Sequence, residues 1–461
     1  MAPVIPSCAE YVAVAASNDG HTATTDSPAL GEEKFLPNEP LRNTIQGGIA
    51  LADQIVISAA NFFTLAIISR NCTLQQTGFF ALAWTITNFV RTVQERTIAT
   101  PYMVFVFQKD SASFLGSTLV QQLCLSLAAS AIVLLVAVGG MLRGDFELSS
   151  VLAATAITLP ILLLRECIRS VSFAHFQFSS AFGLDLAASV TQVLAIMALA
   201  YLQLLSIMNA TLVMGLACLV PSLSWLLNPS ATLRIDRGRL REDWKYNWQF
   251  SRFLLVARLL GMGGFLLMPW LVQLYLSSAE VGAFAVCNSL VGISLLFVTG
   301  TNNYFQPRIV RELHQHGPSA MLRSILVSSL VVGFVLVVIS TLLWFFGDHL
   351  LGWVYGQPYS GYGALVIILC LSVTLVSPSI QFGNGLAALK RTELQVWSEA
   401  AYFVLTISLG LLLIPQIKLI GAGIALLVGG AVASLVSGAI LVALVRHDAS
   451  TQVALSEPVA R

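Results

Sequence analysis

The sequence predicts an all-α polytopic membrane protein with about twelve transmembrane helices in two six-helix bundles related by a parallel internal repeat. Three observations support this fold class. The composition is strongly apolar, the apolar residues form twelve stretches long enough to cross a bilayer, and a motif from the first half of the chain recurs in the second half.

The composition places the chain in a membrane. Its 461 residues have a mean hydropathy of +0.81, and only 10% of them are charged, whereas an average soluble protein carries about 25% charged residues. So few charges cannot cover a surface of this size in water. The net charge of +1 gives no electrostatic reason to bind nucleic acid. We therefore expect an integral membrane protein with membrane lipids as neighbours and no nucleic-acid partner.

The cysteine and histidine residues do not form a metal or disulfide pattern. The seven cysteines are scattered, without a CxxC pair or a Cys/His cluster, so they match neither a disulfide framework nor a metal site. Within apolar helices, cysteine behaves as a small hydrophobic residue. We expect no metal and no cofactor.

Both ends of the chain are polar. Residues 1–42 are rich in polar residues and prolines, and their one apolar run, "YVAVAA", is too short for a signal-peptide core. We expect residues 1–42 to form a disordered cytoplasmic tail, and residues 446–461 to form a second cytoplasmic tail.

Twelve apolar stretches lie between the two tails. A helix needs about 20 mostly apolar residues to cross about 30 Å of hydrocarbon. The predicted spans are residues 48–70, 77–106, 114–139, 149–173, 181–203, 206–228, 247–276, 281–305, 322–347, 361–389, 393–415 and 419–445. The alternatives are eleven or thirteen spans, because only a short segment separates the fifth span from the sixth.

The basic residues predict the orientation, because cytoplasmic loops collect Lys and Arg. With both termini inside, eighteen of the 24 basic residues fall on the inner side, with Arg165 and Arg169 among them, and three fall on the outer side. The remaining three, Arg91, Arg96 and Arg258, lie within or close to the membrane. We expect a multi-pass protein of the cell inner membrane with both termini in the cytoplasm.

The chain divides into two halves at its most basic loop. Residues 229–246 are predicted to be a cytoplasmic basic linker, solvated and close to anionic lipid headgroups. An N-lobe of residues 43–228, with spans one to six, precedes the linker. A C-lobe of residues 247–445, with spans seven to twelve, follows it.

The two halves share a motif at the same place. "AIISRNCTLQQTGFFAL" (66–82) aligns with "WLVQLYLSSAEVGAFAV" (270–286), and each closes one helix and opens the next with Gly-x-Phe-Ala. Transporters with repeats of this kind hold the substrate between the two halves near the membrane midplane. The matching residues are Gly78, Phe80 and Ala81 in the first half and Gly282, Phe284 and Ala285 in the second.

Three stretches resemble a known family. They are "ADQIVISAANFFTLAIISRNCTLQQTGFFALA" (52–83), "LLGWVYGQPYSGYGALVIIL" (350–369) and "LLLIPQIKLIGAGIALLVGG" (411–430). Together they are similar to the multidrug/oligosaccharidyl-lipid/polysaccharide flippase superfamily, and most closely to its polysaccharide biosynthesis branch of the O-antigen type.

This resemblance implies a function. Two six-helix bundles in a V shape would move a lipid-linked oligosaccharide, a polyprenyl pyrophosphate glycan, across the inner membrane by alternating access. The resemblance also implies a place in the biosynthesis of a surface polysaccharide such as lipopolysaccharide, with polysaccharide polymerase and export machinery as further partners.

A buried arginine would suit such a substrate, because guanidinium stays protonated and holds phosphate oxygens in a bidentate fork. Arg258 lies about eleven residues into the seventh span, which is ~16 Å along a helix and near the midplane. We expect it to anchor the head group; the alternative is an interhelical ion pair with Asp53 or Asp185.

The stretch "FVRTVQERTIATPY" (89–102) carries further charges. Arg91 and Glu95 are four residues apart and can pair on one helical face. In one interpretation they face the substrate cavity, with Glu95 positioning Arg91; in the other they neutralise each other. Arg96 points about 140° away, toward the membrane interface.

Two carboxylates complete the candidate site. Asp53 begins the first span, and Asp185 lies in the fifth span on nearly the same face as Gln192. They either couple transport to an ion or pair with arginines. We expect hydrogen bonds to neighbouring helices from the amide side chains of Asn288, Asn302, Asn303, Gln381 and Asn384. The alternative is that these amides contact the sugar.

Two other classes of protein remain to be weighed. A multidrug cation antiporter of the same superfamily would need carboxylates in its cavity, and the seventh and eighth spans contain no Asp or Glu. An enzyme would need a catalytic constellation. The longest loop offers only Asp236, Glu242 and Asp243 among basic residues, so we do not expect an enzyme and assign no catalytic residues.

Overall fold

In the computed structural model, residues 39–227 and 234–456 are described, and they are almost entirely helical. The long helices are α2 (Glu39–Asn71), α3 (Leu74–Gln94), α5 (Ser111–Leu142), α6 (Phe146–Ala174), α7 (Phe178–Tyr201), α8 (Ile207–Leu226), α9 (Arg237–Tyr275), α10 (Ser278–Tyr355), α11 (Gly363–Ala388), α12 (Gln395–Ile417) and α13 (Leu419–Ser456). The short ones are η1 (Glu95–Ala99), α4 (Thr100–Phe105), η2 (Gln357–Tyr359) and η3 (Thr392–Leu394).

These helices account for twelve passes through a membrane. Ten helices in the described part are long and apolar enough to cross one. One of them, α10, consists of two helices that meet at Gly317, where φ is +82°, a conformation that favours glycine. The run α3–η1–α4 adds the remaining pass, with a π-helical turn in its middle. The all-helical, twelve-span fold class is therefore confirmed.

Two helices extend beyond the ends of their predicted spans. Helix α9 begins at Arg237, so the second half of the predicted linker 229–246 is helical. Its start is fixed by Asp236, whose side chain accepts a hydrogen bond from the Gly238 backbone amide. Helix α13 continues to Ser456, into the predicted tail 446–461. Most of the predicted tail 1–42 lies outside the described residues, which begin at Glu39.

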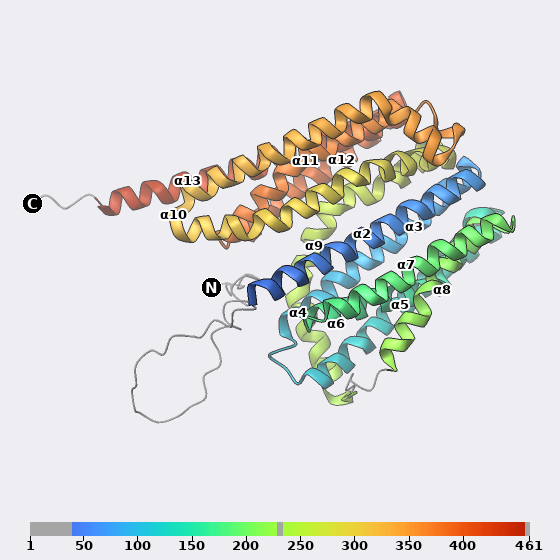
Figure 1. Ribbon diagram of the computed structural model, residues 1–461, viewed down its shortest axis with the longest axis horizontal. Coiled ribbons are helices and arrows are strands. Elements are labelled where there is room, and N and C mark those ends of the chain that lie inside the picture. Colours follow the sequence, from blue (N-terminus) through green and yellow to red (C-terminus); the bar gives the residue numbers. More distant parts are fainter. Residues whose placement is uncertain (1–38, 228–233, 457–461) are drawn as a thin grey trace, which may run out of the picture.

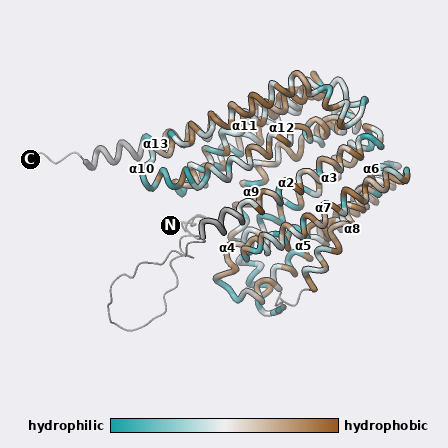
Figure 2. The backbone as a smooth tube through the Cα atoms, in the orientation of Figure 1, coloured by the Kyte–Doolittle hydropathy of each residue, from teal (hydrophilic) through white to brown (hydrophobic). Residues whose placement is uncertain are grey.

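The helices form two bundles (Figure 1). We call α2 to α8 the N-lobe and α9 to α13 the C-lobe. Helix α2 begins and α13 ends at the same end of the molecule, which we call the base; the opposite end is the apex. The two lobes lie close together at the apex and diverge toward the base (Figure 1). Hydrophobic residues dominate the lengths of the helices, and hydrophilic stretches lie mainly at their ends (Figure 2).

The repeated glycines of the two halves meet at the apex. Gly78, near the start of α3, and Gly282, near the start of α10, lie in direct backbone contact: a Cβ on Gly78 would overlap the Ser278 carbonyl oxygen, and a Cβ on Gly282 would overlap the Leu74 carbonyl oxygen. The Gly-x-Phe-Ala repeat therefore forms a close crossing of one helix from each lobe.

Hydrogen bonds reinforce this apical contact. The Arg70 guanidinium donates to the carbonyl oxygens of Trp353 and Val354, the latter at 2.7 Å, and so caps the last turn of α10, where carbonyls lack partners. The Tyr359 hydroxyl donates to Thr77 Oγ1 at 3.0 Å. Burial raises the pKa of Tyr359 to about 12, so its hydroxyl remains a donor at neutral pH.

Candidate functional site

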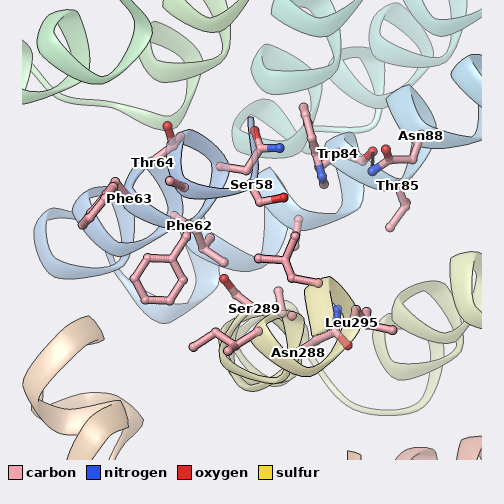
Figure 3. Close-up of a pocket in the computed structure, with 18 of the residues that line it drawn as sticks. Ser58, Phe62, Phe63, Thr64, Trp84, Thr85, Asn88, Asn288, Ser289 and Leu295 are labelled. Atoms are coloured by element: carbon pink, nitrogen blue, oxygen red, sulfur yellow. Dashed lines mark hydrogen bonds between the residues drawn. The ribbon is translucent and has the colours of Figure 1, made fainter. Parts of the chain in front are cut away.

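A cavity lies between the lobes, below the apical contact. Its volume is about 590 Å³, and α2 and α3 of the N-lobe, α9 and α10 of the C-lobe, and Met214 of α8 line it. Ligand pockets typically measure about 300–1,000 Å³. In Figure 3, Ser58 and Trp84 of the N-lobe face Asn288 and Ser289 of α10 across this space.

Within residues 39–227 and 234–456, no charged residue lines the cavity. Its walls combine aromatic rings with side-chain amides and hydroxyls, and none of the described lining residues is Asp, Glu, Lys, Arg or His. The polar lining residues are Gln54, Ser58, Asn61, Thr64, Thr85, Asn88, Asn288, Ser289 and Thr299, and the aromatic ones are Phe62, Phe63, Phe80, Trp84, Phe265 and Phe284.

A smaller hollow continues from this cavity toward the base of the N-lobe. It shares Asn61, Trp84 and Asn88 with the main cavity, and it reaches Arg91 and Glu166. Arg91 follows Trp84 by seven residues on α3, which places it two helical turns, or about 10 Å, closer to the base on the same face.

Arg258 has a position in the C-lobe that is equivalent to that of Arg91 in the N-lobe. It precedes Phe265 by seven residues on α9, so it also lies two turns basal of a cavity residue. Its Nε atom is buried and has no hydrogen-bond partner among the described residues. The charged groups that act on it are Glu95, Arg96 and Arg91 from the N-lobe and Glu399 from α12. Arg258 is therefore a partly buried cation at the junction of the lobes, and no ion pair joins it to another described residue.

The predicted partnership of Arg91 and Glu95 was wrong. Arg91 Nε lies 3.8 Å from Glu166 Oε2, and Glu95 Oε1 lies 3.1 Å from Arg96 Nη2. Two features explain the difference. An arginine four residues before a glutamate is the less favourable order for such a pair, and Glu166 on α6 offers Arg91 a partner in the hollow. Arg96 therefore forms an ion pair with Glu95 and does not only lie at the membrane interface.

Asp53 and Asp185 form a buried ion cluster inside the N-lobe. Arg169 Nη2 lies 2.7 Å from Asp53 Oδ2, and Arg169 Nε lies 2.8 Å from Asp185 Oδ2. Arg165 Nε donates to Asp185 Oδ1 at 2.7 Å. The alternative that Arg258 pairs with Asp53 or Asp185 was therefore wrong, because α6 supplies the partners of both carboxylates.

Two acidic residues were missed in the sequence. Glu166 and Glu399 both lie inside predicted spans, at 149–173 and 393–415, and an ionisable residue within a span is itself a signal of function. Glu399 approaches α9 closely: a Cβ on Gly261 would lie 2.5 Å from its Oε2. Gln395 Nε2 donates to Glu399 Oε1 at 3.2 Å.

Of the C-lobe amides predicted to join helices, Asn302 and Asn384 do so, whereas Asn288 and Gln381 do not. The buried Nε2 and Oε1 of Gln381 have no hydrogen-bond partner among the described residues. Asn384 Nδ2 donates to Asn302 Oδ1 at 2.6 Å and joins α11 to α10, as predicted. Asn288 instead lines the cavity and has no side-chain partner among the described residues, so its predicted role in joining helices was wrong. Residues 39–227 and 234–456 contain no group of three His, Cys, Asp or Glu residues placed to hold a metal.

A comparison with known sequences finds one distant relative. No protein-family model matches the chain. The probable low-salt glycan biosynthesis flippase Agl15 of Haloferax volcanii is 23% identical over 215 residues, which are 46% of this chain and 44% of that protein. The match thus spans less than half of that relative.

Solved structures share the fold over most of the chain. The lipid II flippase MurJ in an inward closed conformation has a TM-score of 0.69 at 11% identity, with 85% of this chain and 86% of that chain covered. An inward-facing multidrug resistance MATE transporter of the MOP superfamily has a TM-score of 0.65 at 12% identity. The alignment covers 87% of this chain and 95% of that transporter. The outward-facing conformation of such a transporter has a TM-score of 0.57 at 12% identity. The alignment covers 88% of this chain and 95% of that transporter.

These comparisons agree on the overall fold. All of these relatives are transporters or flippases and not enzymes. The chain therefore has the two-lobed, multi-pass fold of transporters in the multidrug/oligosaccharidyl-lipid/polysaccharide superfamily, in agreement with the resemblance of its sequence.

Proposed function

We propose that this chain is a flippase that moves a lipid-linked oligosaccharide across the membrane by alternating access of its two lobes. The oligosaccharide would be carried on a polyprenyl pyrophosphate. The names of the glycan-biosynthesis relative and of the lipid II flippase support this substrate class. The charge distribution around the cavity supports it independently.

The observation that carries the proposal is the position of Arg258. The Arg258 side chain is partly buried, and a buried Nε without an acceptor is costly unless a ligand supplies one. Arg91 reaches the same zone from the opposite lobe, at the basal edge of the cavity. Two arginines from two lobes would bind the oxygens of a pyrophosphate, and the ligand would then hold the lobes together during the conformational change.

The acidic residues have supporting roles in this proposal. Glu166 holds Arg91 at 3.8 Å, and Glu95 holds Arg96 at 3.1 Å, so each carboxylate would position an arginine until the head group arrives. Asp53 and Asp185 would hold the N-lobe together through Arg165 and Arg169, in preference to coupling transport to an ion.

A multidrug cation antiporter is less well supported. The fold is shared with multidrug transporters, but a cationic drug needs an available carboxylate, and none is among the described residues that line the cavity. The nearest N-lobe carboxylates, Asp53, Glu166 and Asp185, are all paired with arginines.

The orientation and partners follow from this proposal. The excess of basic residues on one side of the predicted spans supports a cytoplasmic base, so the cavity would receive its substrate from the inner leaflet of the cell inner membrane. After transport the glycan would pass to polysaccharide polymerase and export machinery for a surface polysaccharide, such as the O-antigen of lipopolysaccharide.

The proposal can be tested in cells that lack the gene. We expect polyprenyl-linked oligosaccharides to accumulate and surface polysaccharide to fall, with recovery when the wild-type gene is restored. Arg258→Ala should fail to restore export, whereas Arg252→Ala, which alters an exposed arginine of the same helix, should restore it. Unchanged glycolipids together with new sensitivity to cationic drugs would contradict the flippase proposal and favour the antiporter.

A further inference from the structure

We infer that the charge-free cavity is a binding site for uncharged sugar residues, separate from the arginines that bind the pyrophosphate. This inference rests on the proposed flippase function and adds the class of glycan. It follows from three properties of the cavity: the described lining residues carry no charge, some of their amides make no hydrogen bond, and several of them are aromatic.

The site has two zones: an arginine zone, formed by Arg91 and Arg258, and the uncharged walls of the cavity. Arg91 and Arg258 each lie two helical turns basal of cavity residues, about 10 Å away along their helices. A pyrophosphate bound by both arginines therefore leaves its first sugars at the mouth of the cavity, with the neutral walls beyond them. A carboxylate or phosphate on a sugar would find no cation in these walls. Because burying an unpaired charge is costly, a charged sugar should bind less tightly than a neutral one.

The free amides match sugar hydroxyl groups. No hydrogen bond joins the side chains of Gln54, Asn61 or Asn288 to another described residue. Each amide offers two donors and an acceptor, and each hydroxyl can donate and accept. Asn88 Nδ2 donates to the Trp84 carbonyl oxygen at 3.0 Å, so its Oδ1 remains available as an acceptor. Amides on both lobes can thus bind one glycan from opposite sides.

The aromatic rings supply the apolar part of sugar recognition. Trp84 lies beside Asn88 on the cavity wall (Figure 3), and Phe62 and Phe265 also line the cavity. The flat apolar face of an indole ring packs against the C–H face of a sugar ring, while the surrounding amides bind its hydroxyls. A cavity of about 590 Å³ accommodates a short oligosaccharide and not a polymer.

Binding of three matched probes to the purified full-length chain in lipid nanodiscs tests the inference. The probes are a short-chain polyprenyl pyrophosphate without sugar, the same lipid with three neutral hexoses, and the latter with its terminal hexose replaced by a hexuronic acid. We expect the neutral glycan to bind about tenfold more tightly than either other probe, because one or two net hydrogen bonds contribute about that factor.

Variants connect the preference to the cavity. Asn288→Ala should abolish the advantage of the neutral glycan, and Asn288→Lys should transfer it to the hexuronic acid probe. Asn71→Ala, at an exposed position whose amide bonds within its own helix, should leave the preference unchanged. Since the bare lipid contacts only the arginine zone, its affinity should remain the same in Asn288→Ala.

The outcomes separate this inference from the proposed function. Equal binding of all three probes, or tightest binding of the hexuronic acid probe by the wild type, would overturn the inference while the flippase stands. If none of the three polyprenyl pyrophosphates binds and a cationic dye does, the flippase proposal itself fails, and the inference fails with it.

Discussion

Arg169 binds two carboxylates that come from different helices. Its Nη2 lies 2.7 Å from Asp53 Oδ2 on α2, and its Nε lies 2.8 Å from Asp185 Oδ2 on α7. Both carboxylate side chains are at most 1% exposed. One guanidinium from α6 thus neutralises two buried charges and joins three helices of the N-lobe.

Removal of this guanidinium should destabilise the N-lobe. Arg169→Met leaves two adjacent carboxylates with only Arg165 for compensation, and breaking a buried ion pair from one side costs about 3–5 kcal/mol. We expect a clearly lower melting temperature for the protein in detergent. In the control Arg239→Ala, which removes an exposed pair with Asp236, the change should be under about 1 kcal/mol. Equal melting temperatures for the wild type and Arg169→Met would contradict a structural role for the cluster.

The glycine crossing should control the apical contact. Gly78→Ala places a methyl group where the Ser278 carbonyl oxygen lies, so the lobes must separate at the apex. Spin labels on Gln203 and Ser360, at apical turns of the two lobes, should report a longer distance. Gly300→Ala, where a Cβ meets nothing within 4 Å, should leave the distance unchanged; a matching increase in that control would show that the effect is not specific to the crossing.

Arg70 should hold the apex closed. Arg70→Ala removes the donors to the Trp353 and Val354 carbonyls, and hydrogen bonds to a charged group contribute about 1.5–3 kcal/mol. We expect more rapid thiol labelling of a cysteine introduced at Thr85, on the cavity wall, from the apical side. Labelling at the wild-type rate would show that the glycine crossing and the bond from Tyr359 to Thr77 close the apex without Arg70.

Glu399 should weaken head-group binding. It is the one C-lobe carboxylate among the groups that act on Arg258, so Glu399→Gln removes a competing negative charge and preserves the size of the side chain. We expect tighter binding of sugar-free polyprenyl pyrophosphate, by up to about tenfold. Weaker binding in this variant would mean that Glu399 orients Arg258 instead of opposing the ligand.

The sequence alone predicted the helices and the repeat, because both depend on local patterns. Apolar stretches of sufficient length predict spans wherever they occur, and the recurrence of Gly78 as Gly282 follows from alignment of the two halves. That these glycines contact each other could not be read from the alignment, because their contact depends on how the lobes pack.

The ion pairs were predicted less well, because they depend on residues far apart in the chain. The count of inner charges included Arg165 and Arg169, whereas the structure places them inside α6. The Arg169 partner, Asp53, lies 116 residues earlier, and no local pattern connects the two. Of the asparagines that line the cavity, Asn288 was assigned to a helix contact, since free and bonded amides look alike in a sequence.

The most direct test measures transport in liposomes reconstituted with the purified full-length chain. The substrate is a fluorescent polyprenyl pyrophosphate carrying three neutral hexoses, and the readout is the fraction accessible to a quencher outside. The account predicts that Arg258→Ala reduces flipping to about a tenth or less, since charge-assisted bonds to phosphate are lost, while Arg258→Lys retains part of it and Arg252→Ala all of it. Flipping by Arg258→Ala at the wild-type rate would contradict the central role of this arginine.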